Sequence, residues 1–408
     1  MKQKKLISLT ALLLVVLLSL QLAGCASLAP SVQAANLMEN VTSNRGAALP
    51  VQAEDAAAAA DFALRLFKAG NESDRNTLIS PLSVLTALAM TANGARGETL
   101  AQMEQTLGMD QARLNTFVRS YLDTLPADGS LKLANSIWFK LTPPQEFLQT
   151  IADYYDADIY KAPFDDSTLE DLNNWVKTKT DGMIPKILDR IPPDARMYLV
   201  NALAFDAKWE SPYEPSDLFD GIFTLENGET REVKYMGSAE VCYLENEHAT
   251  GFLKCYKGGK YAFAALLPKE GGRLKDYVDS LTGAELQSLL AERSMEAVDV
   301  SLPKFKTEYD TELSDVMKSM GMELPFADAA DFSGMGGDLA ISRILHKTFL
   351  SVDEQGTKAA AATVVEMAGC AEIMENKRVD LNRPFVYLLI DTETNLPFFI
   401  GTMVDPAA

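Results

Sequence analysis

Hydrophobic and polar residues follow one another along this chain in two rhythms, one typical of helices and one typical of strands. Apolar residues three or four positions apart predict a helix over residues 56–69 that ends at Gly70. A second, buried helix over residues 82–92 follows Ser80-Pro81, where Ser80 can cap the exposed amides. Further helical spacing marks residues 169–176 and 313–320, and strand-like apolar runs cover residues 131–139, 197–205, 261–267, 298–305, 385–390 and 397–404. Helices dominate the first half and strands the second without regular βαβ alternation, which indicates an α+β fold with mostly antiparallel sheets.

The N-terminal residues have the pattern of an export signal. A basic start (residues 2–5) precedes an almost unbroken apolar run (residues 6–22), and small residues stand directly before Cys25. This pattern resembles a bacterial lipoprotein signal, in which Cys25 would become the lipid-bearing N-terminus, held at a membrane through acyl chains without a transmembrane helix. A signal cut elsewhere and a retained membrane anchor are the alternatives.

These features predict how the chain begins. We expect a signal peptide over residues 1–24 and a lipidated flexible tether over residues 25–54, which is rich in Ala, Ser, Asn and Pro and has no strong hydrophobic period. The protein would then be exported and would reside at the cell surface or outside the cell.

Charge and cysteine content exclude several classes of function. The net charge of −20 argues against a nucleic-acid partner, which would require a basic face to neutralise phosphates. Besides Cys25 the chain has Cys242, Cys255 and Cys370, whose spacing fits no zinc pattern. Cys242 and Cys255 lie in neighbouring strand-like runs, so they could pair or could remain free thiols. We expect no metal and no cofactor.

Catalytic motifs are missing as well. The sequence has no His-Glu-x-x-His pair, no Gly-x-Ser-x-Gly elbow and no Gly-x-x-x-x-Gly-Lys phosphate loop. Of the two histidines, His248 stands in a polar, turn-like stretch, and His346 precedes an apolar strand where a buried hydrogen bond is expected instead of a role as a base. The sequence therefore predicts a protein that is not an enzyme.

Residues 351–372 fit both rhythms at once. Helix propensity favours a helix over residues 358–362, because alanine is the best helix former and Thr357 could cap it. With a period of two, however, positions 357, 359, 361 and 363 form one uncharged face of small residues, as in a strand with one buried side. Gly356 supplies a backbone hinge directly before this stretch. A segment that can exist both as an exposed loop and as a central strand is a bistable element.

The same stretch resembles a known family. Residues 354–363 read EQGTKAAAAT and closely resemble the mobile hinge of inhibitory serpins. Ordered matches to that family continue over nearly all of the chain from about residue 55, at residues 76–83 (NTLISPLS), 133–139 (LANSIWF), 172–176 (LNNWV), 199–205 (LVNALAF), 302–305 (LPKF), 382–386 (NRPFV) and 399–401 (FIG). Length alone favours two domains. The resemblance instead implies one serpin domain over residues 55–408, with three mostly antiparallel sheets, eight or nine helices and a reactive loop at about residues 354–380.

The resemblance also implies a function and a partner. Inhibitory serpins trap a serine protease, and in some cases a cysteine protease, in a covalent complex when the cut loop inserts into the central sheet. The hinge positions by match are Glu354, Gly356, Thr357, Ala359, Ala360, Ala361, Ala362 and Thr363. Lys358 stands where many inhibitory members carry Glu, and it lies on the face that would not be buried. We expect a monomer that binds its target protease and, through the anchor, a membrane.

The reactive bond follows from counting. In the family, the residue before the bond usually lies sixteen positions after the hinge glutamate, which places the bond at Cys370–Ala371, give or take one or two residues. Small and apolar neighbours favour an elastase-like or subtilisin-like target, and Lys377 and Arg378 lie too far along to favour a trypsin-like one. Alternatively, Cys370 is simply a small loop residue.

Further family positions lie beneath the strands that part. By match these are Ser80, Ser83, Asn201 and His346, with Trp209 near the end of the sheet where insertion begins. A buried polar cluster can act as a latch, although all five residues could equally serve packing. The main alternative is a serpin-fold protein that does not inhibit, such as a cleavable substrate, a binding module or a carrier. A structural surface lipoprotein is the third interpretation, and it leaves the period-two pattern unexplained.

Overall fold

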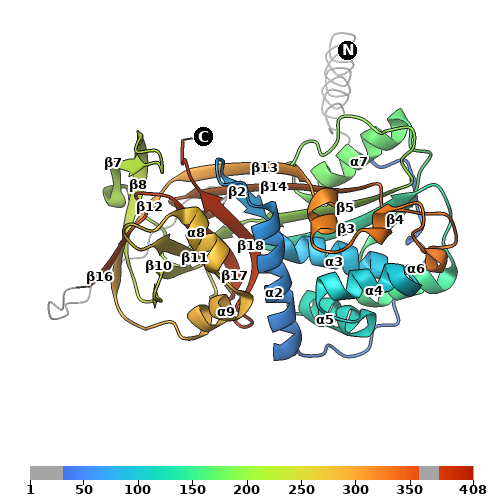
Figure 1. The fold of residues 1–408 in the computed structure, drawn as a ribbon, viewed down its shortest axis with the longest axis horizontal. Helices are drawn as coiled ribbons and strands as arrows, with labels where there is room; N and C mark the ends of the chain where they lie inside the picture. The colour runs from blue at the N-terminus through green and yellow to red at the C-terminus, as the bar shows by residue number, and fades with distance from the viewer. Residues whose placement is uncertain (1–30, 358–375, 408) are drawn as a thin grey trace, which may run out of the picture.

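The computed structural model describes residues 31–357 and 376–407, and these residues form nine α-helices and three β-sheets (Figure 1). The α+β class with mostly antiparallel sheets is confirmed. The helices are α2 (Ala53–Gly70), α3 (Pro81–Ala92), α4 (Gly97–Leu107), α5 (Gln111–Asp123), α6 (Gln145–Tyr154), α7 (Asp166–Lys179), α8 (Leu274–Ser280), α9 (Gly283–Ala291) and α10 (Ser314–Ser319).

The largest sheet has eight strands in the order β1-β4-β3-β5-β14-β15-β6, and β13 pairs with β14 outside this path. We refer to it as the large sheet. Its strands are β1 (Ala35–Asn36), β3 (Leu131–Phe139), β4 (Asp158–Lys161), β5 (Met197–Phe205), β6 (Ala207–Lys208), β13 (Phe305–Glu312), β14 (Arg343–Asp353) and β15 (Gly356–Thr357).

Two smaller sheets complete the fold. The six-stranded sheet has the order β2-β18-β17-β11-β10-β9, and the four-stranded sheet has the order β16-β12-β8-β7. Their strands are β2 (Thr77–Ile79), β7 (Leu218–Thr224), β8 (Thr230–Glu240), β9 (Tyr243–Glu245), β10 (Ala249–Cys255), β11 (Tyr261–Pro268), β12 (Val298–Pro303), β16 (Lys377–Asp380), β17 (Phe385–Asp391) and β18 (Leu396–Met403). The four-stranded sheet lies at the end of the molecule remote from α4 and α6 (Figure 1).

Apolar side chains pack on both faces of the large sheet. On one face, alternate residues of β5 such as Leu203 and Phe205 join the main core with α2, α3 and the six-stranded sheet. On the other face, Val200 and Ala202 pack with Trp175 of α7 in a second, smaller core. Helix α3 is buried along its whole length, because strands and helices surround it, as its continuous apolar sequence predicts. The large sheet is therefore a central layer with helices on both sides (Figure 1).

Part of the predicted tether contacts the folded domain. Ala35 and Asn36 pair with β4 at the edge of the large sheet, and the backbone N–H groups of Gln33 and Ala34 donate to the Asp171 carboxylate at 2.7 and 2.8 Å. Residues 35 and 36 of the predicted tether thus form a short edge strand of the large sheet. Composition does not reveal it, because a two-residue strand is too short to show a hydrophobic period.

Other sequence predictions can be compared element by element. The strands predicted over residues 131–139 and 197–205 are confirmed at both ends. The single strand predicted over residues 298–305 is wrong, since the chain leaves the four-stranded sheet after Pro303 and enters the large sheet at Phe305.

The predicted Ser80 cap is also wrong. Ser80 stands at the N-cap of α3 but its side chain makes no capping hydrogen bond, because the preceding strand β2 and a contact to His346 fix its position.

Candidate functional site

The central strands β5 and β14 are paired over only part of their length. Parallel pairing joins residues 343–346 to residues 198–201 and ends at the pair His346–Asn201. Beyond that pair, within the described part of the chain, residues 202–205 of β5 pair only with β3, and residues 347–351 of β14 pair only with β13. We call the paired part the closed half of the large sheet and the rest the open half.

The hinge strand β15 occupies the far end of the open half. Gly356 and Thr357 pair with Asp353 and Val352 of β14 on one side and with β6 on the other. The Thr357 side chain is 1% exposed, and its Oγ1 lies 2.6 Å from the hydroxyl oxygen of Tyr256. Two residues of the predicted hinge, Gly356 and Thr357, thus already lie between β14 and β6.

Gly356 is required at its position by the backbone. Its φ of +150° is one that residues with side chains rarely adopt, and a Cβ atom there would lie 2.2 Å from the carbonyl oxygen of Ala207. A close approach of two backbones therefore requires glycine at this position, and the role of Gly356 as a hinge stays a prediction.

Trp209 holds the turn that connects β14 to the hinge strand. Its indole Nε1–H donates to the Asp353 carbonyl at 2.8 Å, and its backbone N–H donates to the Gln355 carbonyl at 3.0 Å. The ring is buried and stacks on Tyr256 with ring centroids 4.4 Å apart. The backbone N–H of Tyr213 donates to the Glu354 carbonyl at 2.9 Å. The turn is therefore fixed mainly through main-chain carbonyls, which any residue would supply.

Two ion pairs flank this turn. The Glu354 carboxylate lies 2.5 Å from the Lys304 ammonium, which lowers the pKa of Glu354 below its ordinary value. The buried Lys254 ammonium pairs with Glu240 at 2.7 Å and lies 4.3 Å from the centre of the Tyr213 ring. Because charged groups are seldom buried unless paired, these contacts tie the turn to the ends of the neighbouring strands.

A polar cluster lies where the closed half ends. The Nδ1 atom of His346 is 3.2 Å from the Asn201 side-chain oxygen, and the Ser80 backbone N–H donates to His346 Nε2 at 3.1 Å. His346 is fully buried, and this desolvation lowers its pKa to about 3, so the ring is neutral at pH 7. The expectation of a buried hydrogen bond for His346 is confirmed. Ser83 lies nearby in sequence on α3, where its hydroxyl is buried.

This cluster, which we call the latch, is incompletely satisfied. The Ser80 and Ser83 hydroxyls, the Asn201 amide nitrogen and the Asn135 side-chain oxygen are buried without a hydrogen-bond partner among the described residues. Asn135 stands opposite Asn201 in the β3–β5 pairing. Each buried polar group left unpaired costs about 1–3 kcal/mol. An arrangement in which these groups find partners would therefore be favoured over the present one.

The structure brings seven of the predicted site residues to two places. Ser80, Asn201 and His346 meet at the latch, and Glu354, Gly356, Thr357 and Trp209 meet at the far end of the open half. Cys25, Ala359, Ala360, Ala361, Ala362, Thr363, Cys370 and Ala371 lie outside the described residues. Sequence reasoning missed Tyr256, Tyr213, Lys304 and Lys254, because they meet the hinge across long sequence separations and no local motif marks them.

Other expectations concern cysteines, metals and membranes. Cys242 and Cys255 are both free thiols, so the alternative in which they pair is wrong. Residues 31–357 and 376–407 contain no group of three or more metal-ligating side chains. Over the same ranges, no helix is both long enough and apolar enough to cross a bilayer.

Sequence comparisons match most of this chain to one protein family. The family model of the serpins, described as serine protease inhibitors, matches residues 57–406. An uncharacterized serpin-like protein of Thermococcus kodakarensis is 32% identical over 360 residues, which cover 85% of this chain and 84% of that protein. Leukocyte elastase inhibitor A of Mus musculus is 32% identical over 379 residues, covering 85% of this chain and 97% of the relative.

Solved structures of one thermophilic serpin, tengpin, allow a finer comparison. Its native state is 47% identical in sequence, covers 92% of this chain and 100% of its own, and superimposes with a TM-score of 0.88. Its latent state covers 88% of this chain and 100% of its own, with a TM-score of 0.78 at 44% identity. The described structure is thus more similar to the native state than to the latent state.

Proposed function

The chain belongs to the serpin family, and on that premise we propose that it is a single-use inhibitor of serine endopeptidases, with cysteine endopeptidases as secondary targets. Family members partner with target proteases and trap them instead of catalysing turnover. The protease serine Oγ attacks the carbonyl carbon of Cys370, the peptide bond breaks, and the amine of Ala371 leaves as a new N-terminus. The ester that remains would be stranded when the cut loop enters the large sheet.

The open half of the large sheet is the observation that supports this proposal. Thr357 pairs with Val352 and with Ala207, so the register on each side is known. If the hinge strand continued beyond Thr357 in this register, residues 358–362 would lie opposite residues 347–351 of β14 on one side and opposite residues 202–206 on the other. Thr363 would then lie opposite both His346 and Asn201. Residues 358–362 would enter without breaking any existing strand pair, and Thr363 would be the first to meet the latch.

The faces of the strands match this register. Val352, Leu350 and Thr348 of β14 are each 1% exposed and point toward the main-core face of the large sheet. In the extended register these positions stand beside Thr357, Ala359 and Ala361, the small, uncharged face of the hinge segment. Lys358 falls on the opposite face, so its departure from the family pattern is tolerated.

Insertion is favourable on simple energetic grounds. Each new backbone hydrogen bond contributes about 1 kcal/mol net, and each buried Å² of apolar surface about 25 cal/mol. Separating residues 343–346 from residues 198–201 would lose a few such bonds, and the inserted strand would replace them with bonds on both of its edges. Partners for the unsatisfied latch groups would add to the gain.

The loop sequence favours a target that accepts small or apolar residues. Met367, Ala368 and Gly369 precede Cys370, and none is charged. An elastase-like or subtilisin-like protease with a shallow apolar pocket fits such a stretch. The relative named as an inhibitor of leukocyte elastase supports the same choice.

We further propose that the protein acts outside the cytoplasm, anchored by lipid on Cys25. The sequence pattern before Cys25 is the support for this proposal. Intact-mass measurement and detergent partitioning of the expressed chain would test it, with Cys25→Ala as the comparison. A wild-type chain that carries no lipid would overturn the assignment.

The inhibitor proposal is tested by mixing the protein without residues 1–25 with leukocyte elastase, subtilisin and papain. We expect an SDS-stable complex with at least one serine protease, together with a C-terminal peptide that begins at or near Ala371. Loop cleavage by all three proteases without any stable complex would contradict inhibition, and would favour a non-inhibitory substrate or binding role.

A further inference from the structure

One surface next to the reactive loop has properties that the insertion mechanism does not use. Strand β16 begins at Lys377 and pairs with β12 from Val298, at the edge of the four-stranded sheet. A chain spans at most about 3.5 Å per residue, so Lys377 lies within roughly 25 Å of the bond after Cys370. A protease domain of ordinary size is about 40 Å across. A protease that engages this bond can therefore reach the end of β16.

Two side chains near this strand are unusually exposed for apolar residues. Among the described residues, Met295 (74%) and Val241 (62%) have the largest exposed fractions of any large hydrophobic side chain. Val241 directly follows β8, and Met295 lies three residues before Val298. The two segments meet at the antiparallel bridge between Tyr243 and Ser294. The Met295 Sδ atom also lies 3.8 Å from the Sγ atom of Cys242, the residue after Val241, so the two exposed side chains belong to neighbouring positions. Contiguous exposed apolar surface is typical of protein interaction sites.

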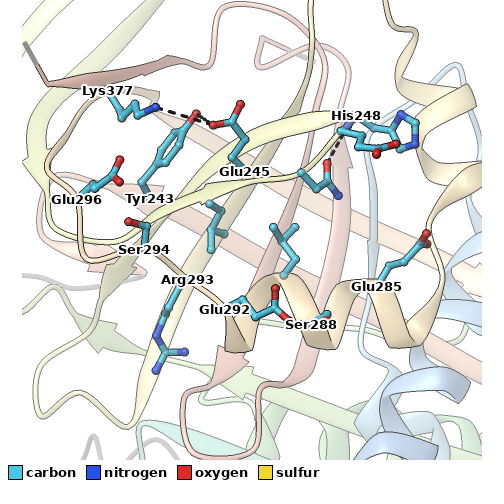
Figure 2. Close-up of a pocket in the computed structure, with 14 residues that line it drawn as sticks. Tyr243, Glu245, His248, Glu285, Ser288, Glu292, Arg293, Ser294, Glu296 and Lys377 are labelled. Carbon is cyan, nitrogen blue, oxygen red and sulfur yellow. Dashed lines mark hydrogen bonds and ion pairs between the residues drawn. The ribbon is translucent and has the colours of Figure 1, made fainter.

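Acidic residues line a cavity that includes Ser294 and Glu296, the chain neighbours of Met295. This cavity of about 400 Å³ is lined by β9, the end of α9, the segment before β12 and Lys377 (Figure 2). Its carboxylates outnumber its fixed cations. The acidic residues are Glu245, Glu247, Glu285, Glu292 and Glu296, and the cations are Arg293 and Lys377. The Lys377 ammonium lies 4.0 Å from Glu245, which also pairs with Lys269 at 3.1 Å, so the remaining acidic residues still outnumber the cations at the cavity.

From this arrangement we infer that Met295 and Val241, with Glu292 and Glu296 at their rim, form a second contact surface for the target protease, one that favours a basic protease surface beside the active-site cleft. We call it the exosite. The inference rests on the proposed inhibitory function for its partner, since the protease bound at the loop is its occupant. Continuity with β16, which carries the chain away from the loop, and the excess of negative charge are the arguments for that occupant.

The exosite acts before insertion, so its effects separate from those of trapping. Apolar contact and charge attraction would raise the rate at which the protease attacks the loop. They would not change how the acyl-enzyme divides between trapped complex and released, cut protein. The total rate of loop attack therefore reports on the exosite, and the fraction trapped reports on the inhibitor mechanism.

The experiment measures the second-order rate of loop attack by leukocyte elastase, counting stable complex and cleaved protein together. We expect the double variant Met295→Gln with Val241→Thr to lower this rate about fivefold, because truncated contacts of this kind cost about 1 kcal/mol. We expect Glu292→Gln with Glu296→Gln to lower it at low salt and to flatten its decrease between about 0.05 and 0.5 M NaCl.

Matched controls change the same residue types elsewhere. Leu49 is 55% exposed and lies outside the four-stranded sheet, so Leu49→Gln should leave the rate unchanged. Glu98 is exposed on α4 at the opposite end of the molecule, so Glu98→Gln should leave the salt dependence unchanged (Figure 1). Rates of both exosite variants within twofold of these controls would overturn the exosite. Cleavage without complex in every variant, with the rate differences preserved, would support the exosite and contradict the inhibitor proposal instead.

Discussion

The two halves of the large sheet have the same strands but different partners. In the closed half, residues 198–201 and 343–346 are joined by parallel pairing, and the neutral His346 ring lies in the latch at the boundary. In the open half the same strands diverge, and only Gly356 and Thr357, among the described residues, stand between them, at the far end. In the closed half, β5 and β14 are thus paired directly. In the open half, among the described residues, only Gly356 and Thr357 occupy the strand position between β14 and β6, at the far end.

Under the proposed insertion mechanism, this difference lets a stable fold accept one more strand. Pairing of Gly356 and Thr357 at the far end fixes the register in advance, so that an entering strand would need no search for its partners. The latch at the other end limits how far it can enter before backbone pairs must break. Trp209 holds the turn before the hinge through hydrogen bonds to main-chain carbonyls. The hinge side chains are not needed for these contacts, so they can be small.

The largest effect is expected from a charge placed on the buried hinge position. Thr357→Arg would set a guanidinium where the side chain is 1% exposed and contacts Tyr256. Because burying an unpaired charge costs several kcal/mol, the guanidinium would keep the hinge strand out of the sheet in the uncut protein, and insertion would then have to bury it. Each 1.4 kcal/mol is about tenfold in a ratio of rates, so the fraction of protease trapped should fall more than tenfold. Gel densitometry of complex and cleaved protein measures it.

The matched control for this variant lies two residues earlier. Gln355 is only half-buried, so Gln355→Arg should trap protease as the wild type does. Equal loss of trapping in both variants would show that any added charge near the turn is harmful, and would contradict a specific role for the open half.

Gly356→Ala sharpens the comparison at the backbone level. The new Cβ would meet the Ala207 carbonyl oxygen at 2.2 Å and would also occupy an unfavourable φ, so we expect a loss of about 1–3 kcal/mol and a lower midpoint of thermal unfolding. Gly271→Ala is the control, because Gly271 has a φ of +82° but no atom within 4 Å of the place that a Cβ would occupy. A midpoint decrease no larger than that of the control would mean that the close approach does not matter.

We expect the stability of the fold to depend on pH because His346 is buried in the latch. The pKa of His346 is lowered to about 3 by burial, against about 6.5 in an unfolded chain. The unfolded state therefore binds more protons between these values, and stability falls as the pH is lowered from about 6.5 toward 3, by at most about 1.4 kcal/mol per pH unit. His346→Gln should make this slope shallower, as followed by thermal unfolding at several pH values. The exposed His248 is the control, and a His248→Gln variant with the same change in slope would contradict the assignment.

The smallest effect concerns the ion pair beside the hinge turn. Glu354 and Lys304 are about one-third exposed, so their pair should contribute about 0.5–1 kcal/mol. A double-mutant cycle with Glu354→Ala and Lys304→Ala would measure it, and the more exposed pair Lys234–Asp220 would give a coupling near zero. Equal coupling in the two cycles would mean that the turn gains nothing special from its ion pair.

Much of the fold could be predicted because the elements themselves carry the signal. The strand β5 is an apolar run interrupted only by Asn201, and β3 ends in the apolar residues Ile137, Trp138 and Phe139. The predicted ends of both strands are confirmed. The division of residues 298–305 between two sheets could not be predicted, because an apolar run does not show which sheet its residues join. The Ser80 cap failed for a related reason, since a capping serine and a serine buried beside a distant histidine look alike in sequence.

The site was predictable only where the family pattern marks it. Gly356 and Thr357 could be identified from the hinge motif, and their seat between β14 and β6 agrees with the alternation read from the sequence. Tyr256 and Lys304 were not identified, because they reach the hinge from strands about 50–100 residues away and have no local motif of their own. The end of the closed half at Asn201 and His346 likewise required the register, which sequence does not give.

The central claim is that the closed half must open for a protease to be trapped. The most direct measurement joins β5 to β14 by a disulfide, using Val200→Cys with Leu345→Cys, which are register partners. The control joins β3 to β5 with Ile137→Cys and Leu199→Cys, a pair that insertion leaves intact. Both variants would carry Cys242→Ser and Cys255→Ser, would keep Cys370 at the proposed bond, and would be mixed with leukocyte elastase before and after reduction.

We expect that the oxidised β5–β14 variant is cleaved without forming stable complex and that reduction restores trapping, whereas the β3–β5 control traps protease in both states. Undiminished complex formation by the oxidised β5–β14 variant would contradict the central claim.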